Sequence, residues 1–150
     1  IDREFGSALL KAIRSLEPRG RGWLWEDPEW ALADEPPADL EAFLAPSDTR
    51  LWRMVGLLRH GHARPSEIAA ATGISPWFTD RLAELIEAES RVVGAPLIDA
   101  KRVGFGDADV AALSGVPPAA IRPSASGSRP RSMSSIKRKN APRQRVELTR

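Results

Sequence analysis

The stretch "SEIAAATGISPWFTDRL", residues 66–82, decides the fold class of this chain. Small alanines precede Gly73, and Ser75 followed by Pro76 opens a second helical segment, so the stretch predicts two helices joined by a tight turn. Pairs of this shape occur in DNA-binding proteins and also in many proteins that bind no nucleic acid. The outward face of the second helix separates these two interpretations.

That outward face is predicted to be acidic. A helix that reads DNA offers Arg, Lys, Asn or Gln to base edges and phosphates, and acids beside phosphates weaken binding. We therefore interpret the charges of this helix as a solvent-exposed face, and Trp77 and Phe78 as anchors for a neighbouring helix. The polar residues that we place on this face, with a net charge of −3, are Thr79, Asp80, Arg81, Glu84, Glu87 and Glu89.

Apolar residues recur at helical spacing along most of the chain, and no stretch alternates like a strand. The pattern predicts an all-α fold, a small domain of short packed helices that contains the helix-turn-helix-like pair. On the first helix, Phe5, Leu9, Ala12, Ile13 and Leu16 are expected to share one face. This first helix is expected over residues 2–17. Besides the pair around Gly73, the other segments with helical spacing are residues 36–45, 50–61, 96–103 and 106–115, and another helix begins near residue 116.

Residues that cap helices mark several of the expected boundaries. Asp39 or the preceding turn is placed to cap the helix over residues 36–45, and Ser47 or Asp48 to cap the helix that follows. Gly61 is a plausible left-handed stop, and Pro65 is preset for a first helical turn. Residues 18–37, rich in Pro, Gly, acids and tryptophan, show neither period and predict an irregular surface connection.

Composition limits the classes of protein that are possible. The 150 residues have no cysteine, which is typical of a reducing cytoplasm, and no apolar run long enough to cross a membrane. We expect a soluble cytoplasmic protein with one modest core. The chain starts at Ile1 without a methionine, which we interpret as the start of a fragment.

The charge of the chain is divided between its body and its tail. Residues 1–121 hold 13 Lys and Arg against 19 Asp and Glu, whereas residues 122–150 hold 9 against 1. The tail has too few apolar residues to offset its ordering entropy, so it is expected to be a disordered basic tail. Two interpretations of it stay open: non-specific binding to nucleic acid or anionic surfaces, and translation in a shifted reading frame.

No residue pattern indicates a catalytic, cofactor or metal site. His60 and His62 flank Gly61, but a metal would need further converging ligands, and a histidine at a helix end more often meets free carbonyls. No Gly-rich phosphate loop follows a strand, and no Ser, His and Asp set has a recognisable frame. The candidate residues are instead anchors for helix packing or for an interface: Trp52, Trp77, Phe78 and Leu82.

Four segments, in order, resemble the helical linking or oligomerisation domain of the carbamoyl phosphate synthetase large chain. They are "IDREFGSALLKAIRSLE" (1–17), "DTRLWRMVGLLRHG" (48–61), "EIAAATGISPWFTDRLAELIEAE" (67–89) and "AKRVGFGDADVAALSGVPPAAIR" (100–122). Asp2 and Ser75 depart from the usual residues, residues 18–47 match little, and the family pattern stops after residue 122. The last departure favours the interpretation of the tail as a frame-shifted segment.

The resemblance implies how the chain is divided and what it does. Residues 1–17 look like the helix that ends the first ATP-grasp half, 18–37 are an irregular connection, 38–121 are the helical oligomerisation-type domain, and 122–150 are the tail. The family enzyme makes carbamoyl phosphate from bicarbonate, ATP with Mg²⁺ or Mn²⁺, and ammonia from a glutaminase small subunit. This chain lacks the ATP-grasp lobes, so the resemblance implies a non-catalytic fragment that links the two halves and associates with other large chains.

A second interpretation comes from a different functional class. The chain could be a small DNA-binding regulator that uses residues 66–89, with the basic tail as an auxiliary phosphate contact. The acidic face of the second helix weighs against it. Titrating duplex DNA against residues 1–121 distinguishes the two interpretations.

Overall fold

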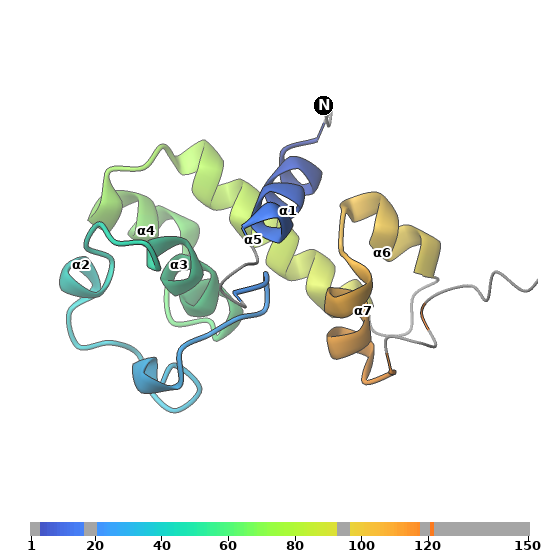
Figure 1. Ribbon diagram of the computed structural model, residues 1–150. Helices are drawn as coiled ribbons and strands as arrows, with labels where there is room; N and C mark the ends of the chain where they lie inside the picture. Colours follow the sequence, from blue (N-terminus) through green and yellow to red (C-terminus); the bar gives the residue numbers. More distant parts are fainter. Residues whose placement is uncertain (1–3, 17–20, 93–96, 118–120, 122–150) are drawn as a thin grey trace, which may run out of the picture.

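The computed structural model describes residues 4–16, 21–92, 97–117 and 121. Within these ranges the chain forms seven α-helices, one short 3₁₀ helix and no strands, which confirms the predicted all-α fold (Figure 1). The elements are α1 (Phe5–Ser15), η2 (Pro28–Trp30), α2 (Leu40–Phe43), α3 (Arg50–Arg59), α4 (Pro65–Thr72), α5 (Pro76–Val92), α6 (Leu97–Val103) and α7 (Asp107–Ser114). The expected disordered tail and most of the expected helix near residue 116 lie outside the described residues.

Helix α5 is the central element of the fold. At 17 residues it is long enough for α3 and α4 to pack at one end, α1 near its middle, and α6 and α7 at the other end (Figure 1). Its buried residues recur at steps of three and four, so one stripe faces the core. These buried residues are Thr79, Leu82, Leu85, Ala88, Glu89 and Val92.

The helix pair predicted from residues 66–82 is formed by α4 and α5. Helix α4 has Pro65 in its first turn and stops at Gly73, whose φ of 70° lies in the left-handed region that favours glycine. The backbone N–H of Ile74 then donates to Thr72 Oγ1 at 3.2 Å, and α5 begins at Pro76. The sequence around Gly73 therefore forms the tight turn that was predicted from it.

The irregular connection supplies part of the core. We call residues 21–37 the strap. Its Trp23 and Leu32 are 2% and 1% exposed and belong to the same apolar cluster as the helices. Trp52 Nε1 on α3 donates to the backbone carbonyl of Gly22 at 2.8 Å, which fixes the strap against that helix. The sequence pattern missed these contacts because the strap has no regular spacing.

One predicted helix start is wrong, and the first helix buries only part of the apolar face on which its residues were placed. Leu16 is 63% exposed, and the buried residues of α1 are Leu10 and Ile13, because α1 turns its face of residues 6, 10 and 13 toward α5 and α6. Helix α3 begins after Thr49 without a side-chain cap, and Asp48 instead accepts a hydrogen bond from Arg21 of the strap at 2.8 Å.

Other expected helix ends are confirmed. Asp39 caps α2, its carboxylate accepting the backbone N–H of Ala42 at 3.0 Å. Gly61 follows the end of α3 with a φ of 71°, and its N–H donates to the carbonyl oxygen of Leu58 at 3.2 Å. Local capping chemistry thus sets the boundaries of these short helices.

Candidate association surface

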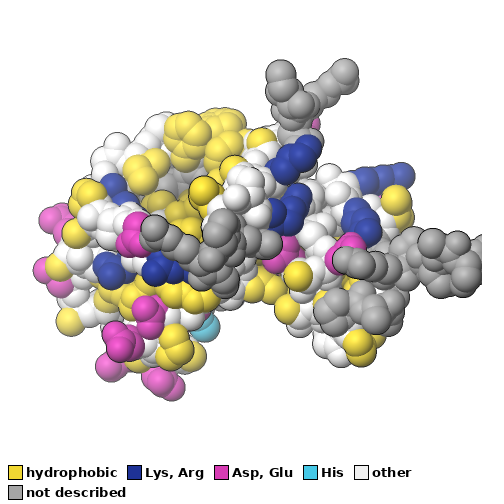
Figure 2. Space-filling model, in the orientation of Figure 1, with side chains coloured by type: hydrophobic (Ala, Val, Ile, Leu, Met, Phe, Trp, Pro, Cys, Tyr) yellow, Lys and Arg dark blue, Asp and Glu magenta, His cyan; other side chains and the backbone are white. Residues whose placement is uncertain are grey.

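Three aromatic rings form a cluster on the surface where α5 begins beside α1. We call Phe5, Trp77 and Phe78 the aromatic cluster. The ring centroids lie 4.9 to 5.6 Å apart in edge-on arrangements. Trp77 and Phe78 are 51% and 45% exposed, and hydrophobic side chains gather on the surface near the start of α5 (Figure 2). The cluster therefore leaves large apolar rings in contact with water.

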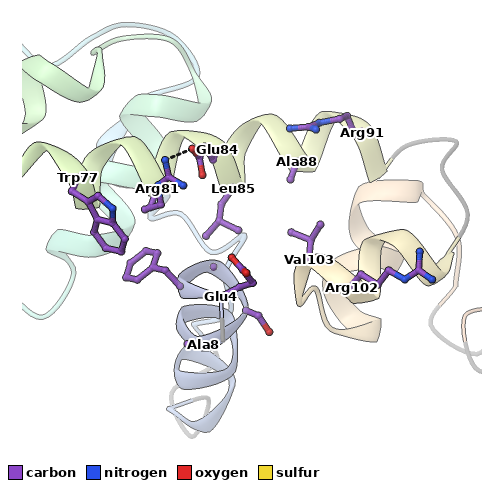
Figure 3. A pocket seen from close by; sticks show the side chains of 13 residues that line it. Glu4, Ala8, Trp77, Arg81, Glu84, Leu85, Ala88, Arg91, Arg102 and Val103 are labelled. Carbon is purple, nitrogen blue, oxygen red and sulfur yellow. Dashed lines mark ion pairs between the residues drawn. The ribbon is translucent and has the colours of Figure 1, made fainter. Parts of the chain in front are cut away.

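A groove of about 720 Å³ continues from the cluster between α1, α5 and the end of α6. Leu85, Ala88 and Val103 point into it from α5 and α6, and Trp77 lies at one end (Figure 3). The residues that line it are Glu4, Phe5, Gly6, Ser7, Ala8, Trp77, Arg81, Glu84, Leu85, Ala88, Arg91, Arg102 and Val103. We call this surface the α1/α5/α6 groove.

Charged side chains of both signs surround the groove. Arg81 forms an ion pair with Glu84, and its guanidinium carbon lies 5.9 Å from the Trp77 ring centroid (Figure 3). Arg91 and Arg102 stand at the opposite side, and Glu4 lies at the start of α1. An apolar floor with a mixed polar rim is the usual anatomy of a protein–protein contact surface.

The four residues predicted as anchors separate into two pairs. Trp52 and Leu82 are 8% and 3% exposed and lie in the core, where Trp52 packs edge-on against Trp25 with centroids 5.8 Å apart. Trp77 and Phe78 remain at the surface. Their rings pack edge-on against each other and against the ring of Phe5 on α1. Their role as interface anchors stays a prediction.

Glu89 is not part of the solvent-exposed face predicted for α5. It is 6% exposed and accepts hydrogen bonds from Trp23 Nε1 at 2.5 Å, Arg59 Nε at 3.0 Å and Arg59 Nη2 at 2.8 Å. Thr79, predicted on the same face, is fully buried. The prediction was wrong because Glu89 lies seven residues after Leu82, on the buried stripe, a spacing that the sequence already contained.

The two histidines are joined to the strap. His60 Nε2 lies 3.1 Å from Glu26 Oε1, and His62 Nε2 lies 2.6 Å from the carbonyl oxygen of Leu32. Their rings stack with centroids 5.9 Å apart. Within the part of the chain that the structure describes, no group of three or more His, Cys, Asp or Glu residues is arranged to hold a metal ion.

Two further properties restrict the class of site. No described helix combines the length and the apolar character needed to cross a bilayer. Along α5, Asp80, Glu84 and Glu87 remain exposed, so the side chains that a DNA reader would turn to phosphates are acidic. The structure is that of a small, all-helical domain with exposed aromatic rings beside an open groove.

Comparison with known proteins places this domain in a family. The model of the carbamoyl-phosphate synthetase large chain, oligomerisation domain, matches residues 1–127. This chain belongs to that family of domains, and the resemblance found in the sequence is confirmed.

The related proteins are much longer than this chain. The carbamoyl phosphate synthase large chain of Thermomicrobium roseum is 40% identical over 118 residues, which are 75% of this chain and 11% of the relative. That of Mycobacterium sp. (strain JLS) is 38% identical over 120 residues, 75% of this chain and 10% of the relative. The large chain of Clavibacter sepedonicus is 34% identical over 138 residues, which are 87% of this chain and 12% of the relative. The chain thus corresponds to one domain of these large chains and spans only 10 to 12% of their length.

Proposed function

We propose that this chain acts as the linking and oligomerisation domain of a carbamoyl phosphate synthetase large chain. The observation that carries the proposal is the family match over residues 1–127. The half-exposed aromatic cluster supports it, because aromatic residues are enriched where proteins associate. In this role the domain joins the two synthetase halves and supports contact between large chains, without catalysing a reaction by itself.

The reaction of the intact enzyme is part of the same proposal. We infer that a full large chain carrying this domain makes carbamoyl phosphate from bicarbonate, ATP and glutamine-derived ammonia, in the cytoplasm, for arginine and pyrimidine synthesis. ATP and its Mg²⁺ or Mn²⁺ would bind the ATP-grasp lobes, and the ammonia would come from a glutaminase small subunit. In this proposal the helical domain takes no part in binding them.

We also propose the division of the chain that the sequence suggested. Residues 38–121 form the helical domain, residues 1–17 belong to the end of the preceding half, and residues 18–37 connect the two. The burial of Trp23 and the strap contact with α3 support a connection that is bound tightly to the helical domain. Residues 122–150 would then be an appended basic tail.

A chimera tests the linking role. The segment of the Thermomicrobium roseum large chain that aligns with this chain is replaced by residues 1–121, and synthesis of carbamoyl phosphate is measured with the small subunit present. We expect activity within a few-fold of the unchanged enzyme. A flexible linker of equal length serves as the control and should lower activity strongly. A chimera no better than this control would contradict the proposal.

The DNA-binding alternative is not favoured. Exposed Asp80, Glu84 and Glu87 on α5 would lie against phosphates in a helix-turn-helix complex, which lowers affinity. Any binding through the basic tail would be non-specific and would weaken steeply with salt.

A further inference from the structure

We infer that His60 and Glu26 form a pH-sensitive latch, which holds the strap against α3 more tightly when the His60 imidazole is protonated. His60 Nε2 lies 3.1 Å from both carboxylate oxygens of Glu26, so the contact joins the C-terminal end of α3 to the strap. The inference goes beyond the proposed function and does not depend on it, because it concerns the attachment of one segment of the chain to another.

The first argument is the balance of charge around Glu26. Arg59 donates two hydrogen bonds to Glu89, from Nε at 3.0 Å and from Nη2 at 2.8 Å, whereas its Nη1 lies 3.8 Å from Glu26 Oε2. The guanidinium is therefore bound most closely to Glu89, and a neutral imidazole leaves the charge of Glu26 largely unbalanced. One proton on His60 makes the group of two carboxylates, one guanidinium and one imidazolium neutral.

The second argument is that the contact is partly removed from water. The side chains of His60 and Glu26 are 28% and 21% exposed. A Cβ added at Gly56 would lie 3.4 Å from Glu26 Oε2, so this glycine leaves room for the carboxylate to lie against α3. Solvent and salt weaken an ion pair in such a position less than one that is fully exposed.

His62 is the other titratable group beside His60, and it does not provide the same response. Its ring stacks on the His60 ring with centroids 5.9 Å apart, and its Nε2 lies 2.6 Å from the carbonyl oxygen of Leu32. Nε2 donates this hydrogen bond, because a carbonyl oxygen only accepts, and a neutral imidazole can donate it as a charged one does. A second proton, on His62, would place two cations side by side. The response to pH is therefore assigned to His60.

The composition of the chain allows the latch to be isolated in experiment. Histidine is the side chain that ordinarily changes its charge between pH 5 and 8, and the chain has two histidines and no cysteine. A change in the attachment of the strap across this range can therefore be assigned by replacing the two histidines one at a time.

Hydrogen–deuterium exchange of the full chain tests the latch. The exchange of the amides in residues 21–37 is measured at pH 6 and pH 8, and is divided at each pH by the exchange of an unstructured peptide of the same sequence. We expect the wild-type strap to exchange about threefold faster at pH 8 after this correction, which is the size of effect that a partly exposed ion pair produces.

Three variants assign the change to the latch. His60→Gln keeps an N–H that can donate to Glu26 but cannot take up a proton, so the dependence on pH should disappear. His62→Gln is the matched control, since it keeps a donor for the Leu32 carbonyl oxygen and should retain the wild-type dependence. Glu26→Gln removes the carboxylate and should also abolish the dependence, which keeps the inference testable if His60→Gln does not fold. Far-UV circular dichroism checks the helical fold of each variant.

The results that would overturn the latch are distinct from a failure of the proposed function. Equal corrected exchange of the wild-type strap at both pH values would overturn it. So would a folded His60→Gln or Glu26→Gln chain that keeps the wild-type dependence, or a folded His62→Gln chain that loses it. An inactive chimera, by contrast, would contradict the linking role and leave the latch standing, because the exchange is measured within one chain.

Discussion

At the scale of single residues, Glu89 is the most informative position in the chain. A carboxylate that is 6% exposed requires compensation, and here one indole N–H and two guanidinium N–H groups supply it. These donors belong to Trp23 of the strap and Arg59 of α3, so Glu89 on α5 ties together segments that are far apart in sequence. Its spacing from Leu82 placed it on the buried stripe, but its charge led to the prediction of a solvent-exposed position.

Glu89→Gln should destabilise the fold by about 2 to 3 kcal/mol, since it removes the nearer of the two carboxylate charges beside the largely buried Arg59 and leaves only Glu26, 3.8 Å away. Glu87→Gln is the matched control on the same helix, because Glu87 is exposed and lies 3.8 Å from Arg91 in a surface pair. Its cost should stay below about 0.5 kcal/mol. Urea unfolding followed by tryptophan fluorescence measures both, and equal losses would show that Glu89 is not a central contact.

Glu67 gives a prediction about pH. The backbone N–H of Arg64 donates to its carboxylate at 2.7 Å, and with the Arg64 side chain this holds the pKa of Glu67 below its ordinary value. A lowered folded-state pKa adds stability above the unfolded-state pKa, and this contribution is lost as pH falls through the folded-state pKa. Glu67→Gln imitates the protonated group, so it should destabilise the chain at pH 7 and by progressively less as pH falls through the folded-state pKa.

The comparison of wild type with Glu67→Gln removes the titration of the other carboxylates, because these are present in both proteins. Urea unfolding midpoints at neutral pH and at successively lower pH measure the difference, which should shrink as the Glu67 carboxylate protonates. A difference that persists unchanged at acid pH would contradict the assignment of this stabilisation to the ionised carboxylate.

At the scale of helices and connections, regular spacing and caps predicted the elements well, and irregular segments were predicted poorly. Helix α4, its stop at Gly73 and the start of α5 at Pro76 follow from local chemistry alone. The burial of Trp23 and the exposure of Leu16 depend on which segment packs against which, and no local pattern encodes that choice. Trp77 and Phe78 were predicted as anchors for a neighbouring helix or an interface. Phe5, the third member of the aromatic cluster, was placed only on one face of the first helix, and no local pattern joins it to the other two rings.

The crossing of α1 and the end of α6 depends on Gly104. Its φ of 110° disfavours a side chain, and a Cβ added there would lie 2.7 Å from the Cα of Ser7. Gly104→Ala should therefore cost about 2 to 3 kcal/mol. Gly22→Ala is the control, since a Cβ at Gly22 meets no atom within 4 Å, and its effect should stay within about 0.5 kcal/mol. Thermal unfolding by circular dichroism compares the two variants, and similar melting temperatures would contradict the close crossing.

At the scale of the whole molecule, the described helices and the strap share one apolar cluster that extends from Leu10 on α1 to Ile121. The helix-turn-helix-like pair lies within this body as a packing element. Its exposed acids disfavour phosphates, whereas its exposed aromatic residues favour contact with protein. The family assignment of a domain for oligomerisation agrees with this division of the surface.

The measurement that tests this account most directly is sedimentation equilibrium of the full chain, alone and with a labelled DNA duplex, at moderate salt. The account predicts an average mass that rises with concentration from the monomer value of 16.4 kDa toward twice that value, unchanged by the duplex. A chain that stays monomeric at every concentration and binds the duplex in a sequence-dependent way would contradict it.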